Sequence, residues 1–281
     1  MGPGEHGLKR LIVTADDFGA CLPVNEAVEA AHLNGILTAT CLMVAAPMAA
    51  DAVERAGRLP KLRVGLHVVV VRGAPVLPPE RIPDLVDADG RFDDNLVRAG
   101  FRYFFLPGVR RQLAAEIRAQ FEAFRATGLP LDHANAHNHM HLHPTVLGLI
   151  IEIGREFGLA AVRLPHEPGS GIFLTPWIAL MKRRLRRAGL NFNDFIFGIR
   201  ETGKMDGAAL KRIIAALPDG ISEIFLHPAT GPWPGIEPEA AGFRFVDEFQ
   251  ALIDPSSRAA VADAGAELIA FGDLTRNNQT W

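Results

Sequence analysis

The chain has 281 residues, of which 48% are hydrophobic and 22% charged, so it contains enough apolar material for one large core. A formal net charge of −3 and a pI near 6.4 give no broad positive field, and we expect no nucleic-acid partner. Cys21 and Cys41 are the only cysteines and form no CxxC pair, which argues against a disulfide framework. The sequence shows no secretory signal and no apolar run of about 18 residues. We therefore expect a cytoplasmic protein with one domain over residues 1–281.

Short apolar runs rich in β-branched residues alternate with longer stretches of helical periodicity, a pattern typical of βα units and a mainly parallel sheet. Seven runs are predicted to be strands: Leu11–Ala15, Ala39–Val44, Val64–Val70, Leu131–Ala136, Ala160–Leu164, Glu223–Leu226 and Leu268–Phe271. The predicted helices lie between them: Pro23–Leu33, Met48–Arg58, Val109–Ala126, Thr145–Phe157, Trp177–Ala188, Gly207–Leu217 and Val246–Ile253. Seven strands are close to the number that closes a barrel.

The clearest helix is "VRRQLAAEIRAQFEAFRATG", which carries one apolar face and ends at Gly128, a residue suited to a helix C-terminus. The side chains of that face are Leu113, Ile117, Phe121 and Phe124. Residues 71–107 and 228–245 are rich in Pro and Gly and show weak periodicity, so they are predicted to be long loops. Long loops in a compact α/β domain are often functional.

Polar side chains follow five of the predicted strands, and parallel α/β folds build their sites at the carboxyl ends of strands. These side chains are Asp16, Asp17, His67, His137, Arg163 and His227. Each has an ordinary alternative: a helix-capping turn for the aspartates, a buried core histidine, a buried ion pair, or a hydrogen bond to a loop carbonyl. Their coincidence at one end of the sheet favours a shared site.

One carboxylate and two imidazoles hold a divalent ion and leave positions open for water and substrate, as metal-assisted hydrolysis requires. A second carboxylate beside the ligand can accept the proton of the water. Asp16 and Asp17 fit these two tasks, because adjacent residues at the end of a strand point in different directions. The sequence therefore indicates a hydrolytic metal site.

Five of the ten histidines fall within eleven positions: His133, His137, His139, His141 and His143. A helix would bring some of them together at i, i+4, but Pro144 is better suited to begin the next helix than to lie inside one. A strand would place all five on one face. We expect a strand up to about Ala136, a loop that carries the histidines, and a helix that starts near Pro144.

The motifs "LIVTADDFG", "VGLHVVV", "NAHNHMHLHP" and "EIFLHPA" together resemble the YdjC-like carbohydrate deacetylases, in order from residue 11 to about residue 230. The stretches "FFLPGVRRQLAAEIRAQFEAFRATGLPLDHANAHNHMHLHPTV" and "AVRLPHEP" resemble the branch associated with hopanoid biosynthesis. The resemblance implies a distorted TIM-like (β/α) barrel of about seven parallel strands. It also implies metal-dependent removal of acetyl from an N-acetylated sugar.

The resemblance assigns Asp17, His67 and His137 as metal ligands and Asp16 as the general base. In the hypothesis that follows, Arg163 orients Asp16 or the substrate and His227 protonates the leaving amine. The family motif usually resembles "DSHHHVH" where this chain has "NAHNHMH", which leaves the hydrogen-bond partners of the ligands undecided.

The remaining histidines of the run receive lesser roles. His139 and His141 are expected to contact the substrate or the metal ligands. His133 and His143 are expected to lie outside the site. A single divalent ion is expected, with Mg²⁺ favoured by the resemblance and Zn²⁺ as the alternative that imidazoles prefer.

The expected substrate is an amino sugar: first the N-acetylglucosaminyl head group of a hopanoid glycolipid, and second a soluble chitooligosaccharide. The stretch "WIALMKRRLRRAGL", residues 177–190, has the pattern of a basic amphipathic helix that contacts the inner membrane, or of a solvent-exposed barrel helix. Two rival classes are a metal phosphoesterase and a non-catalytic histidine-rich metal-binding protein. No Gly-rich phosphate loop supports the first, and the second leaves the other strand-end residues unexplained.

Overall fold

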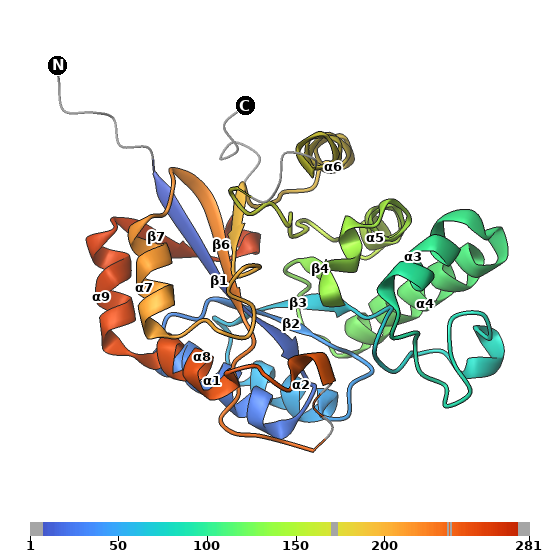
Figure 1. The fold of residues 1–281 in the computed structure, drawn as a ribbon, viewed down its shortest axis with the longest axis horizontal. Coiled ribbons are helices and arrows are strands. Elements are labelled where there is room, and N and C mark those ends of the chain that lie inside the picture. Colours follow the sequence, from blue (N-terminus) through green and yellow to red (C-terminus); the bar gives the residue numbers. More distant parts are fainter. Residues whose placement is uncertain (1–7, 170–173, 235, 237, 275–281) are drawn as a thin grey trace.

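The computed structural model describes residues 8–169, 174–234, 236 and 238–274. In these ranges seven strands pair in parallel, in the order β4-β3-β2-β1-β6-β5, and β7 pairs with the first half of β1. The strands are β1 (Lys9–Phe18), β2 (Ala39–Leu42), β3 (Arg63–Val68), β4 (Ala134–Ala136), β5 (Phe195–Phe197), β6 (Gly220–Leu226) and β7 (Ala266–Ile269). Figure 1 shows them in the middle of the molecule.

Helices cover the sheet on its flanks, with α7, α8 and α9 at the left of Figure 1 and α3, α4 and α5 at the right. The helices are α1 (Leu22–Asn34), α2 (Ala49–Gly57), α3 (Leu96–Phe105), α4 (Pro107–Ala126), α5 (Pro144–Glu156), α6 (Thr175–Ala188), α7 (Gly207–Ala215), α8 (Phe245–Ile253) and α9 (Pro255–Asp263). Within the described ranges, no helix combines the length and apolarity needed to cross a bilayer.

Strand β1 lies between β2 and β6 in the middle of the sheet, and its apolar run is covered on both faces. Leu11, Ile12 and Val13 have no exposed surface. Strands buried on both faces read as continuous apolar runs, which is why this strand is visible in the sequence. The strand is longer than predicted and includes Asp16 and Asp17. These two candidate site residues are therefore part of a buried strand.

Two helix predictions are confirmed in detail. The predicted apolar face of α4 is buried, with Leu113 and Ile117 fully covered, and the helix begins at Pro107. Helix α5 begins at Pro144, and His143 caps it by accepting a hydrogen bond from the backbone N–H of Thr145. Proline suits the first turn of a helix because the N–H it lacks has no partner there.

The structure corrects the predictions for three segments. Ala160–Leu164 is no regular strand, because only single bridges join it to β4 and to Asn191. The fifth strand of the chain is instead β5, which was not predicted. The predicted loop 71–107 contains the 3₁₀ turn η1 (Pro79–Arg81) and helix α3, and α9 was not predicted. Loop 228–245 contains η4 (Pro238–Ala240), while positions 235 and 237 lie outside the described residues.

The parallel α/β prediction is confirmed, and the sheet curls towards a barrel without regular closure in the described residues. Edge strands β4 and β5 are not paired with each other. Segment 160–164 lies between them and makes two backbone hydrogen bonds with Ala134 on one side and two with Asn191 on the other. A regular seven-stranded TIM-like barrel is therefore not confirmed.

Candidate active site

Three predicted ligands meet at the carboxyl ends of β1, β3 and β4. Oδ1 of Asp17 lies 3.2 Å from Nε2 of His67 and 3.1 Å from Nδ1 of His137, and the two nitrogens are 3.3 Å apart. All three donor atoms lie within 4.8 Å of one another, as ligands of one ion do. This donor set of one carboxylate and two imidazoles fits a divalent cation with coordination positions to spare.

Asp17 reaches this position through an unusual backbone. Its φ of 63° is left-handed, and the register of β1 against β2 shifts between Ala15 and Phe18. Asp tolerates this region better than most residues, yet the conformation costs about 1–3 kcal/mol. The buried side chain of Asn25 holds the turn by accepting a hydrogen bond from Gly19 N–H at 2.8 Å and donating to the carbonyl of Met48. Asn25 of helix α1 thus stabilises the turn in which the Asp17 side chain points towards the two histidines.

The His67 and His137 rings determine the charge state of Asp17. Burial by itself would raise the pKa of its carboxyl, but the neighbouring His137 and His67 rings hold the pKa well below its ordinary value. Asp17 is consequently an anion, the form that binds a cation.

Asn135 determines which nitrogen of His67 faces the cluster. Nδ1 of His67 lies 2.7 Å from the amide oxygen of Asn135, and the amide nitrogen of Asn135 lies 3.3 Å from Oδ1 of Asp16. A carboxylate only accepts, so the amide nitrogen must face Asp16 and the amide oxygen must face His67. Nδ1 of His67 therefore donates to Asn135, and Nε2 is the nitrogen that faces the ligand position.

Asp16 forms a buried ionic cluster with Arg163 and Glu223. Arg163 donates to both carboxylate oxygens of Asp16, at 2.6 and 2.8 Å, and its Nε and Nη2 donate to Glu223. All three side chains are nearly or fully buried. Burial alone would raise the pKa of Asp16, but the charge and hydrogen bonds of Arg163 lower it far below its usual value. Asp16 is thus held as an anion, with both carboxylate oxygens bonded to Arg163.

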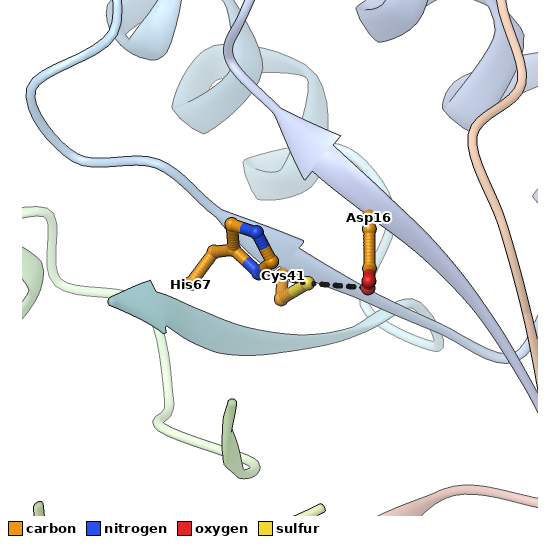
Figure 2. Close-up of side chains that lie close together, drawn as sticks. All are labelled: Asp16, Cys41 and His67. Atoms are coloured by element: carbon orange, nitrogen blue, oxygen red, sulfur yellow. Dashed lines mark hydrogen bonds between the residues drawn. The ribbon is translucent and has the colours of Figure 1, made fainter. Parts of the chain in front are cut away.

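Cys41, at the end of β2, joins Asp16 and His67 in a second group that could hold a metal (Figure 2). Its Sγ donates to Oδ1 of Asp16 at 2.9 Å and lies 3.2 Å from Nδ1 of His67. Burial and the charge of Asp16 raise the pKa of the Cys41 thiol well above its usual value, so it is protonated and a poor ligand. The two groups share His67, whose Nδ1 faces this group and whose Nε2 faces Asp17.

The histidine run is a kinked 3₁₀ segment, η2 (His137–Leu142), in which Asn138 and His139 have left-handed backbones. Nδ1 of His141 accepts a hydrogen bond from Ala136 N–H, so His141 supports the backbone next to His137. Burial lowers the pKa of His139 to about 3 and that of His141 well below its usual value, so both rings are neutral.

The other two histidines of the run lie where the sequence placed them, outside the cluster. His133 stacks on Phe271 and lies 3.0 Å from Oδ2 of Asp132, and His143 caps α5. The strand, loop and helix predicted for this stretch are therefore correct in outline.

A cavity of about 760 Å³ opens over the cluster. Asp16, Asp17, His67 and His137 lie at its wall. His139 and His227 line the same cavity, and the His227 ring lies between Phe225 and Phe243, with centroids 5.6 and 5.7 Å away. Trp233, Phe243 and Phe245 add further aromatic surface. The cavity thus combines an ionised polar wall with aromatic faces, which suit the C–H surface of a sugar ring.

Three residues of this arrangement were missed from the sequence: Cys41, Asn135 and Glu223. A usable signal existed for two of them. Glu223 is a charged residue inside the apolar run "ISEIFL", and such a residue needs a buried partner. Asn135 precedes His137 by two positions, so in a strand it shares the face of that ligand. Cys41 carried no distinguishing pattern.

A curled parallel α/β sheet with a carboxylate and two imidazoles at its carboxyl edge defines the class: an α/β protein with a candidate metal site inside a large cavity. The profile of the family described as YdjC-like protein matches residues 10–263. The chain belongs to the YdjC-like family.

Two carbohydrate deacetylases are similar in sequence to most of this chain. A carbohydrate deacetylase of Geobacillus stearothermophilus is 31% identical over 268 residues, which span 94% of this chain and 97% of that one. A carbohydrate deacetylase of Thermoanaerobacter pseudethanolicus is 30% identical over 223 residues, 79% of this chain and 82% of that one. A crystal structure of a candidate cellobiose-phosphate cleavage protein from Enterococcus faecalis V583 has a TM-score of 0.75 at 23% identity and covers 94% of this chain and 98% of that one. The similarity to the Enterococcus faecalis protein is a similarity of fold alone.

Proposed function

We propose that this protein is a metal-dependent hydrolase that removes the acetyl group from an N-acetylated amino sugar. The observation that carries the proposal is the convergence of Asp17, His67 and His137 beside a second ionised carboxylate, Asp16, at the wall of one cavity. Relatives described as carbohydrate deacetylases along most of the chain support the same reaction and the sugar class.

Each residue has a defined task in this reaction. Asp17, His67 and His137 would hold a divalent ion, which supplies polarisation of the acetyl carbonyl and a lowered pKa for a water. Asp16, kept ionised by Arg163, accepts the proton of that water. His227 lines the same cavity and donates a proton to the amine as the C–N bond breaks. The products are acetate and a free amino sugar.

Acetate release from an N-acetylglucosamine-bearing substrate, with chelator treatment and metal add-back, tests the proposal. We expect His137→Ala to lose bound metal and turnover together, because it removes one of three ligands. Asp16→Asn should keep the metal and lose turnover. A His137→Ala protein that retains both would disprove the site.

The leaving-group role of His227 has a separate test. General acid–base catalysis contributes about 100- to 10,000-fold, so His227→Ala should leave slow but measurable acetate release. An amide with a better leaving group should recover most of the lost rate in this variant, since it does not need the proton. Equal losses on both substrates would contradict the role.

We further propose Mg²⁺ or Zn²⁺ as the ion. Two imidazoles in a three-ligand set are typical of zinc, whereas the family resemblance favours magnesium, which prefers oxygen ligands. Add-back of each metal to the chelated protein, measured by acetate release and by metal content, distinguishes the two.

The leading substrate is the N-acetylglucosaminyl head group of a hopanoid glycolipid, with a soluble chitooligosaccharide as the second candidate. The glycolipid proposal rests on the resemblance of residues 104–146 and 161–168 to the hopanoid-associated branch. Comparing kcat/KM for the glycolipid in mixed micelles with that for a chitooligosaccharide in the same micelles decides between them. Higher efficiency on the free oligosaccharide would favour the second.

A further inference from the structure

Helix α3 carries an exposed apolar surface that the proposed chemistry does not use. We call it the α3 stripe, and it consists of Val97, Phe101, Phe104, Phe105 and Leu106, which are 83%, 61%, 45%, 59% and 42% exposed. The rings of Phe101 and Phe105 lie 4.6 Å apart, and those of Phe104 and Phe105 lie 4.9 Å apart. The three phenylalanines of the stripe therefore form one continuous aromatic surface.

This helix is apolar on two sides, which is unusual for an exposed element. Ala99 and Tyr103 face the protein and are buried, and the Tyr103 hydroxyl donates to the carbonyl of Val70. The stripe residues Val97, Phe101 and Phe104 follow a spacing of four and three and form a different face of the same helix. Clustered apolar surface of this kind marks an interaction site.

The segment that forms the stripe is basic, although Asp93 and Asp94 lie directly before it. Residues 95–112 contain four arginines, Arg98, Arg102, Arg110 and Arg111, and no acidic residue. Arg98, Arg110 and Arg111 are exposed. Arg98 pairs with Asp93 just before the helix, and Arg102 lies 3.9 Å from Asp84. Aromatic side chains ringed by arginine are typical of surfaces that enter the headgroup layer of an anionic bilayer.

The stripe lies next to the active-site elements. Phe104 and Tyr103 each contact the His143 ring at a centroid distance of 6.2 Å, and His143 directly follows the segment η2 that carries His137. The segment between β3 and α3 contributes Arg72 and Arg91 to the wall of the cavity. In Figure 1, α3 lies with α4 at the right-hand end of the molecule, away from the central strands.

We propose that the α3 stripe is a peripheral membrane contact that binds an anionic lipid surface. A second copy of the chain is a poorer occupant, because a twofold interface would bring the arginines of one stripe against those of the other. This contact is independent of the reaction in the cavity, so a failure of the deacetylase proposal would leave it standing.

Helix α6, which contains most of the basic amphipathic stretch 177–190, offers less apolar surface. Its residues Ile178, Met181 and Leu185 are buried against the domain, and Leu180 is 44% exposed. Arg184 donates to the carbonyl of Pro144 and is likewise engaged within the protein. The apolar face that a membrane contact requires is thus available on α3.

Co-sedimentation of the full chain with two kinds of vesicle tests the contact. One kind is phosphatidylcholine alone, and the other is phosphatidylglycerol and phosphatidylcholine at 3:7, about one-third anionic lipid. We expect binding to the anionic vesicles that weakens with salt. Phe101→Ser with Phe105→Ser should lower the partition coefficient about tenfold or more. Arg102→Gln with Arg111→Gln should lower it about fivefold for each arginine.

Matched controls are Leu180→Ser on α6 and Leu33→Ser on α1, which remove exposed apolar side chains elsewhere and should leave vesicle binding unchanged. Far-UV circular dichroism and thermal unfolding should be unchanged in the phenylalanine and arginine variants, which shows that each folds. Loss of binding in Leu180→Ser alone would place the contact on α6 and overturn the proposal. Absence of wild-type binding, or a dimer that the phenylalanine variants convert to monomer, would also overturn it.

Discussion

Asn135 lies between His67 and Asp16, accepting a hydrogen from the first and donating to the second. One side chain thereby sets the tautomer of a ligand and the orientation of the candidate base. The same amide also donates to Sγ of Cys41 at 3.2 Å, so it is held from three directions. Hydrogen-bond partners of this kind commonly contribute 10- to 100-fold, or about 1–3 kcal/mol, to metal affinity.

Asn135→Ala should therefore weaken metal binding by about 10- to 100-fold while the three ligands remain in place. Isothermal titration calorimetry of the metal-free protein with Zn²⁺ measures the change in affinity. Asn135→Asp is the matched control, because a carboxylate still accepts from Nδ1 of His67 and should recover part of the affinity. Equal affinity in wild type and Asn135→Ala would refute this role.

Arg163 has no exposed surface and depends on two carboxylates for its hydrogen bonds. Glu223→Gln would turn a donor towards a guanidinium that has only donors, so we expect a loss of about 3 kcal/mol in the free energy of unfolding. Urea unfolding followed by circular dichroism gives the value. Glu267→Gln, at an exposed position on β7, should change stability by less than about 0.5 kcal/mol. A loss no larger than this control would show that Glu223 is dispensable.

At the scale of elements, the contacts of α1 show how helices position the sheet edge. Helix α1 follows the Asp16–Asp17 turn and supplies Asn25 to it, while its C-terminal end packs against α8. Gly35, just after α1, is so close to α8 that a Cβ built on it would lie 2.2 Å from the carbonyl oxygen of Leu252. The Ile36 N–H donates to that same carbonyl, so the contact cannot open without loss of a hydrogen bond.

Gly35→Ala should therefore destabilise the protein by about 1–3 kcal/mol, because backbone must move to admit the methyl group. Gly57→Ala, at the end of α2, is the matched control: its Cβ would meet nothing within 4 Å. Removing glycine from a helix end with open space should stabilise by up to about 1 kcal/mol. Thermal unfolding compares the two, and a Gly35→Ala protein as stable as Gly57→Ala would contradict the packing argument.

At the scale of the whole molecule, the candidate metal site joins segments that are far apart in the chain. Asp17 comes from β1, His67 from β3 and His137 from η2, so an ion held by all three would connect 120 positions of sequence, as the Asp17–His137 contact already does. Such an ion binds the folded state and not the unfolded chain, in which the ligands are separated. Binding is therefore linked to folding.

A free metal concentration about 100 times Kd should stabilise the fold by about 2.7 kcal/mol, or raise Tm by about 5 °C for a chain of this size. Differential scanning fluorimetry with Zn²⁺ and with Mg²⁺ measures the shift. His137→Ala should abolish it. A shift that persists in this variant would place the stabilising ion elsewhere.

The amino-acid sequence alone determined the features that depend on local patterns. Continuous apolar runs specified the buried strands β1 and β6, and the 3.6-residue periodicity of α4 specified its buried face. Pro144 located the start of α5. The strand-end rule brought Asp17, His67 and His137 into one candidate set before their contacts were known, because the carboxyl ends of parallel strands share one edge.

Only the tertiary structure decided the features that depend on partners distant in the chain. Ala160–Leu164 has a strand's composition, yet it makes single bridges because its neighbours β4 and Asn191 do not align with it as a ladder. The partners of Arg163 lie 60 and 147 positions away, so no local pattern could identify them. The same holds for the surfaces of α3 and α6: their sequences both carry arginines and apolar residues, and only packing shows which apolar face stays exposed.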